Sequence, residues 1–122
     1  MRAIRGAITV DENTEKEILE ASGLLFKEIV EKNHLSEEEI VSIIFSVTPD
    51  LDAVYPARAI REMGYKNIPL FDVAEMYVKG SLSKIIRVLI FVNRDTPLDN
   101  MVHVYLRDAK KLRPDLVKGE KR

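Results

Sequence analysis

Residues 84–93 (KIIRVLIFVN) constrain the fold more than any other part of this chain, because they are β-branched and apolar on both faces of an expected strand. At a period of two, one face carries Ile85, Arg87, Leu89 and Phe91, and the other carries Ile86, Val88, Ile90 and Val92. A strand that is apolar on both faces must be covered on both. We therefore expect a central strand with helices over one face and, in so small a chain, neighbouring subunits over the other.

The remaining segments predict helices and strands that alternate early and then become mostly strands. Strands are expected at 3–10, 40–48, 67–72 (beginning near Pro69), 84–93 and 101–107, helices at 14–33 and 57–63, and one helical turn at 36–39. The boundaries rest on local signals, such as the capping box of Thr14 and Glu17 and the bracketing of the short helix by Pro56 and Gly64. The predicted class is α/β or α+β, with a sheet packed on one side by helices. One domain over residues 1–116 and a mobile tail at 117–122 are expected.

Charge and composition exclude several classes of function. The formal net charge is −1 and the pI is near 6.1, so we expect neither nucleic acid nor an anionic membrane as a partner. The chain has no cysteine, which excludes disulfides and thiol catalysis. Its two histidines, His34 and His103, are isolated from carboxylates in the sequence, and they make a poor metal site. We expect no metal and no cofactor, and a cytoplasmic location, since no signal or membrane-spanning run is evident.

The arginines stand in unusual positions. Arg87 is the one charge in an apolar strand, and burying its guanidinium unpaired would cost several kcal/mol. Arg5 repeats the pattern more weakly, and Arg58 and Arg61 lie three apart on a short helix. Such arginines favour recognition of carboxylate or phosphate groups. The alternative is internal ion pairing with nearby acidic residues, namely Glu62, Glu75 or Asp72.

A series of short stretches resembles the trimeric barrel-type chorismate mutases in order and spacing, from residue 1 to about 116. They are 4–10 (IRGAITV), 48–51 (TPDL), 53–59 (AVYPARA), 61–62 (RE), 68–70 (IPL), 75–76 (EM), 86–88 (IRV), 103–106 (HVYL) and 112–116 (LRPDL). The resemblance implies a mixed sheet with helices outside, and a homotrimer that forms a pseudo-α/β barrel. It implies active sites in the clefts between subunits, where chorismate rearranges to prephenate in aromatic amino-acid biosynthesis.

The resemblance also implies catalytic roles for two residues and binding roles for others. Arg87 matches the arginine that hydrogen-bonds the ether oxygen and a carboxylate of the substrate, and Glu75 matches the glutamate that accepts from the ring hydroxyl. Arg5 and Tyr105 match residues that hold the carboxylates.

Further positions match the wall and the mouth of the family's site. Arg61 and Arg113 match cations at the mouth, and Leu112 matches an apolar wall residue. Tyr55 stands where the family commonly has phenylalanine, and Arg58 where it commonly has lysine. The first change keeps an aromatic ring and the second keeps a positive charge. Asp72 departs from the pattern, because the family usually has cysteine or asparagine beside the substrate ring. A second carboxylate there would repel a dianion unless it pairs with an arginine or becomes protonated.

Two alternatives stay open at this point. The first is an imine/enamine deaminase-like trimer, against which the stretches 48–59 and 112–116 argue. The second is a non-catalytic anion-binding trimer, against which the joint presence of Arg87 and Glu75 argues. A mutase needs no nucleophile, since one C–O bond breaks as one C–C bond forms.

Overall fold

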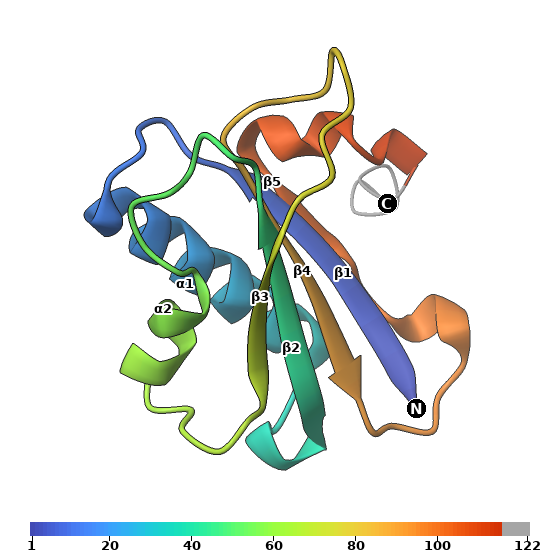
Figure 1. Cartoon of the computed structure of the whole chain (residues 1–122). Helices are drawn as coiled ribbons and strands as arrows, with labels where there is room; N and C mark the ends of the chain where they lie inside the picture. The colour runs from blue at the N-terminus through green and yellow to red at the C-terminus, as the bar shows by residue number, and fades with distance from the viewer. Residues whose placement is uncertain (116–122) are drawn as a thin grey trace.

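The computed structural model describes residues 1–115, which form one five-stranded sheet with its helices (Figure 1). The elements are β1 (Arg2–Thr9), α1 (Glu15–Asn33), η1 (Glu37–Glu39), β2 (Ile40–Val47), α2 (Ala57–Glu62), β3 (Leu70–Ala74), β4 (Ile85–Val92), η2 (Leu98–Asn100), β5 (Val104–Leu106) and η3 (Arg107–Lys111). The mobile tail expected at 117–122 lies outside the described residues.

The sheet has the strand order β3-β2-β4-β1-β5 and is mixed. Strand β4 runs antiparallel to both of its neighbours, β2 and β1. The outer strands β3 and β5 run parallel to β2 and β1. The strand that is apolar on both faces is thus the central one, as predicted, and the mixed α+β class is confirmed.

One face of the sheet carries the main hydrophobic core. Helices α1 and α2 lie together on this side (Figure 1). Helix α1 buries Ile18, Leu25, Phe26 and Ile29 at the predicted helical spacing, and each is no more than 1% exposed. Burial of side chains of this size stabilises the fold by about 2 kcal/mol each. Thr14 starts the helix as predicted, because its Oγ1 accepts the Glu17 amide at 3.1 Å.

Gly6 allows β1 to approach this core closely. A Cβ atom at Gly6 would lie 2.8 Å from Cδ1 of Ile29 and 3.0 Å from the carbonyl oxygen of Val104. The second contact is with backbone, which cannot move aside as a side chain can. A glycine at this position is therefore required for α1, β1 and β5 to pack together.

The opposite face of the sheet, here called the open face, is covered at one end alone among the described residues. There η3 packs Ala109 and Leu112 against Ala7 and Tyr105. Elsewhere the face exposes apolar side chains, including Phe71, which is 66% exposed. The expectation of helices on one face is confirmed, whereas the expected subunits on the other stay a prediction. No helix within residues 1–115 is both long enough and apolar enough to span a membrane.

Arg94, just after β4, ties the C-terminal end of α1 to η1. Its guanidinium donates to both carboxylate oxygens of Glu39, at 2.9 and 2.8 Å, and to the carbonyl oxygens of Asn33 and His34, at 2.8 and 3.1 Å. Carbonyls at a helix end lack intrahelical partners, so this arginine both caps the helix and forms an ion pair. His34 ends the helix in a left-handed conformation.

Two strands differ from their predicted bounds. Strand β3 begins at Leu70, as expected from a start near Pro69, whose carbonyl accepts the Ile43 amide, but it extends to Ala74 and not to residue 72. Strand β5 spans Val104–Leu106 and not 101–107, because the Asn33 side chain takes both backbone groups of Val102. A side chain of α1 thus replaces part of the expected ladder.

Candidate active site

Arg87 lies in a row of residues that crosses all five strands on the open face. Backbone pairing aligns Ser46 with both Val73 and Arg87, Arg87 with Ala7, and Ala7 with Tyr105. Because alternate residues of a strand point to opposite faces, the members of one row share a face. The row brings together side chains from distant parts of the chain.

Glu75, which follows β3, forms an ion pair with Arg87. The Arg87 Nε atom lies 3.0 Å from Glu75 Oε2, and Ser46 Oγ donates to the other carboxylate oxygen at 2.5 Å. The Glu75 amide donates to the Val47 carbonyl at 2.9 Å, which fixes the backbone just beyond β3. The Arg87 side chain is 47% exposed. Within the described part of the chain, it forms its ion pair through Nε. Its terminal amino groups are therefore available to a ligand.

A cavity of about 300 Å³ opens beside this pair. Its lining includes Arg5, Arg87, Ser46 and Tyr105, with apolar walls from Ile44, Val73, Val88 and Leu89. We call it the arginine cavity. Two guanidinium groups and a phenol beside an apolar wall suit a small carboxylated ring compound.

Two predicted site residues, Leu112 and Arg113, follow η3 and interact with Tyr105 of the arginine cavity. Leu112 packs against Tyr105 and Ala7. Arg113 donates to Asp115 at 3.1 and 2.9 Å, and this bond, more than its interaction with Tyr105, raises the pKa of Arg113.

A second cavity of about 660 Å³ lies at the other side of β3. Its lining includes Tyr55, Arg58 and Asp72, together with Val73, which the two cavities share. Tyr55 is 70% exposed. We call this the tyrosine cavity. The predicted site residues thus fall into two groups on one chain.

Asp72 is anchored to the start of α2. Its Oδ1 atom accepts the amide of Ala57, the first residue of the helix, at 3.1 Å. Burial raises the pKa of Asp72, while the Ala57 hydrogen bond and the charge of Arg61 act in the opposite direction. A raised pKa and an adjacent cation both reduce the repulsion that a second carboxylate was expected to cause.

Arg58 is already paired in the single chain. Its Nε atom donates to Glu62 at 2.8 Å and its Nη1 atom to Glu15 at 3.1 Å. The hydrogen bond to Glu62 is the main cause of its raised pKa. The alternative of internal ion pairing thus describes Arg58 well, and it also applies to Arg87 through Glu75. Arg61 is exposed and lines neither cavity.

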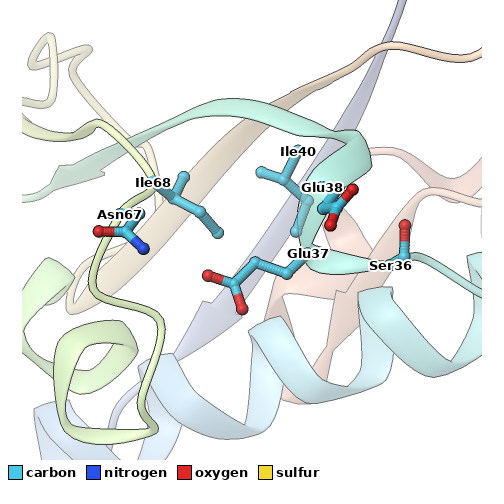
Figure 2. Close-up of a pocket in the computed structure, with 6 residues that line it drawn as sticks. All are labelled: Ser36, Glu37, Glu38, Ile40, Asn67 and Ile68. Atoms are coloured by element: carbon cyan, nitrogen blue, oxygen red, sulfur yellow. The ribbon is translucent and has the colours of Figure 1, made fainter.

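A third hollow of about 720 Å³ is chemically unsuited to an anion (Figure 2). It lies between η1 and the segment before β3 and is lined by Ser36, Glu37, Glu38, Ile40, Asn67 and Ile68. Figure 2 shows the Glu37 carboxylate extending toward Asn67 and Ile68. Two glutamates would repel a carboxylated ligand. Volume alone therefore does not identify the site.

Comparison with known proteins decides the family. Residues 1–116 match the family described as chorismate mutase type I. The chain belongs to this family.

Named relatives agree over nearly the whole length. The chain is 47% identical over 117 residues to chorismate mutase AroH of Bacillus subtilis (strain 168), which covers 95% of this chain and 92% of that protein. It is 48% identical over 117 residues to chorismate mutase AroH of Thermus thermophilus, with coverage of 95% and 96%. The solved structure of a chorismate mutase from Clostridium thermocellum superposes with a TM-score of 0.89 at 50% identity, covering 91% of this chain and 99% of that one.

The enzyme is therefore an isomerase, a chorismate mutase of aromatic amino-acid biosynthesis. The deaminase-like and non-catalytic alternatives are not favoured. Asp50 and Asp52, which Leu51 separates in the sequence, do not form a carboxylate pair, because Asp50 accepts from Thr48 and Lys84 while Asp52 accepts from Asn13. Within residues 1–115, no group of three histidine, aspartate or glutamate residues is placed to hold a metal ion.

Sequence reasoning missed one polar residue of the arginine cavity. Ser46 donates a hydrogen bond to the Glu75 carboxylate. It lies in the largely apolar strand IVSIIFSV, and no role in the site was predicted for it. A signal was present, because a serine in a strand expected to be largely buried needs a hydrogen-bond partner.

Proposed function

We propose that chorismate binds in the arginine cavity and rearranges to prephenate with its ether oxygen against Arg87. The observation that carries this proposal is the Arg87–Glu75 pair, held by Ser46 beside Arg5 and Tyr105. Chorismate carries two carboxylates, a ring hydroxyl and an ether oxygen. The cavity offers cations for the first, a carboxylate for the second and guanidinium donors for the third.

Arg87 acts on the bond that breaks. Negative charge grows on the ether oxygen as the C–O bond lengthens, so a guanidinium donor placed there stabilises the transition state more than the substrate. Glu75 keeps the guanidinium from rotating away, and its oxygens retain lone pairs for the ring hydroxyl. An acceleration of ~10⁶-fold corresponds to about 8 kcal/mol, which geometry and electrostatics can supply together.

Arg5 and Tyr105 restrain the substrate in its compact conformation by binding a carboxylate. Leu112 forms part of the apolar wall beside Tyr105. These contacts fix the two reacting carbon atoms near one another before the bond forms.

Charge balance supports a site completed by a second copy of the chain. Arg5 and Arg87 contribute two positive charges and Glu75 one negative charge, which leaves one positive charge against a dianion. We propose a homotrimer in which the tyrosine cavity of one subunit faces the arginine cavity of the next. Tyr55 would then form an aromatic wall, Arg58 and Arg61 would add cations, and Asp72 would hold α2 beside the substrate ring. Arg113 would lie at the mouth.

A cytoplasmic location is part of the same proposal. It rests on the sequence, in which no cysteine requires an oxidising compartment.

Conversion of chorismate by the purified protein tests the function. Loss of the ultraviolet absorbance of chorismate would be followed, and prephenate identified by NMR. We expect saturable turnover that Arg87→Ala abolishes although the variant remains folded. Turnover unchanged by Arg87→Ala would refute the placement of the reaction in the arginine cavity.

A further inference from the structure

His103 makes an unusual hydrogen bond to the backbone of an arginine of the site. The Arg5 amide donates to His103 Nδ1 at 2.9 Å. Strand β1 pairs with β5 through Gly6, Ala7 and Ile8 alone among the described residues. An imidazole ring therefore holds the β1 backbone at the residue just before the ladder begins.

Asn33 fixes the chain next to His103. Its side chain is buried, donates to the Val102 carbonyl at 2.8 Å and accepts the Val102 amide at 2.8 Å. Asn33 is the last residue of α1, and its Nδ2 atom also donates to the Ile29 carbonyl at 3.0 Å. Asn33 thus ties Val102, the residue before His103, to the C-terminal end of α1.

The hydrogen bond requires a neutral imidazole. A ring nitrogen accepts only when it carries no proton, so Nδ1 must be bare and the proton of the neutral ring must lie on Nε2. The charged groups that act on this ring within residues 1–115 are Arg5 of β1 and Arg113, which follows η3 and is paired with Asp115. Burial, with these two cations, lowers the pKa of His103.

We propose that His103 is a positioning residue for Arg5, whose main-chain amide it holds so that the guanidinium is presented to the arginine cavity. The proposal rests on the proposed function, in which Arg5 binds a substrate carboxylate. It implies that protonation of His103 weakens substrate binding, because the protonated ring no longer accepts the Arg5 amide and the backbone that carries the Arg5 guanidinium loses this hydrogen bond.

Two variants of similar shape separate positioning from packing. His103→Asn keeps an acceptor close to the position of Nδ1, whereas His103→Leu has none. We expect His103→Asn to keep KM for chorismate within about threefold, and His103→Leu to raise KM about tenfold or more, the effect of losing one hydrogen bond of roughly 1.4 kcal/mol. An equal rise of KM in both variants would overturn the proposal.

The pH dependence offers a second comparison. KM of the wild type should rise as the pH is lowered below 6.5, the ordinary pKa of histidine, because burial lowers the pKa of His103 and the ring gains its proton only below that value. The rise should be smaller in His103→Asn, which cannot be protonated. Superimposable profiles of the wild type and His103→Asn would contradict the proposal.

Nitrogen-15 NMR of the untagged protein tests the hydrogen bond without any assay of turnover. The sequence has two histidines, so His34→Asn assigns the signals of His103. We expect the Nε2–H tautomer at neutral pH, and an Nδ1–H tautomer or an imidazolium would overturn the proposal. The expected tautomer in a protein that converts no chorismate would refute the proposed function while supporting the His103–Arg5 bond.

Discussion

Arg87 combines two properties that a residue stabilising developing charge needs. Its Nε atom is held at 3.0 Å by Glu75, and its side chain is 47% exposed, so its terminal nitrogen atoms are accessible to a ligand. A guanidinium fixed before the reaction needs little reorganisation as charge develops. Arg58, in contrast, is bound by two glutamates of its own chain.

This difference predicts a division of labour between the two arginines. Arg87→Lys should lower kcat by about 10²-fold or more, because an ammonium group cannot keep the Glu75 contact and the substrate contact together. Arg58→Ala should change kcat by less than about tenfold and act mainly on KM. Steady-state kinetics of the two variants would decide, and similar losses of kcat would contradict the assignment.

The sequence predicted which side chains meet better than it predicted how they are held. The single charge in an apolar strand marked Arg87, and the resemblance marked Glu75, Arg5 and Tyr105. The supporting contacts of Ser46 and His103 depend on the register between strands, which one sequence does not reveal. The carboxylate of Asp72 was expected to repel the substrate dianion, but it accepts a hydrogen bond from the Ala57 amide at the start of α2.

At the scale of elements, the bounds set by strong local signals could be predicted from the sequence. The bounds set by contacts between distant parts of the chain could not. The capping box at Thr14 and the apolar periodicity placed α1 and β4 closely. The bounds of β5 could not be predicted, because the competitor for its ladder is Asn33, far away in sequence. A polar side chain at a helix end gives no sequence signal of the backbone it will bind.

The Arg94–Glu39 ion pair, which joins the segment after β4 to η1, predicts how the free energy of unfolding depends on pH. The Arg94 hydrogen bond holds the pKa of Glu39 at about 2, below its usual 4.5. Stability from this pair is therefore present above about pH 4.5 and is lost as the pH falls toward about 2. Arg94→Gln should lower the free energy of unfolding near neutral pH by about 1–2 kcal/mol, and the difference from the wild type should shrink in acid.

Urea unfolding at several pH values measures this difference. The matched control is Lys16→Gln, which removes an exposed pair with Glu20 at 3.9 Å and should have little effect. A difference between Arg94→Gln and the wild type that stays constant down to about pH 2 would contradict the assignment.

At the scale of the whole molecule, the open face predicts assembly. Phe71 of β3 aligns with Ile44 of β2, which in turn aligns with Leu89 of β4 on the open face. The Phe71 side chain is 66% exposed. A charge at this apolar position should prevent burial against another subunit. Phe71→Lys should therefore sediment as a smaller species than the wild type and lose turnover while keeping its helical circular dichroism.

Leu98→Lys is the control for the assembly prediction. Leu98 is 68% exposed but lies on η2, outside the strands of the sheet. It should leave the sedimentation coefficient unchanged. A monomeric wild type that is fully active would refute the proposed trimer.

The row that crosses all five strands also has a consequence for how the enzyme is made. Its members run from Ala7 on β1 to Tyr105 on β5, and β5 lies parallel to β1. A ribosome must therefore release almost the entire chain before the last strand can dock beside the first. We therefore expect a nascent chain that stops before Tyr105 to be inactive, because it lacks the last strand of the row.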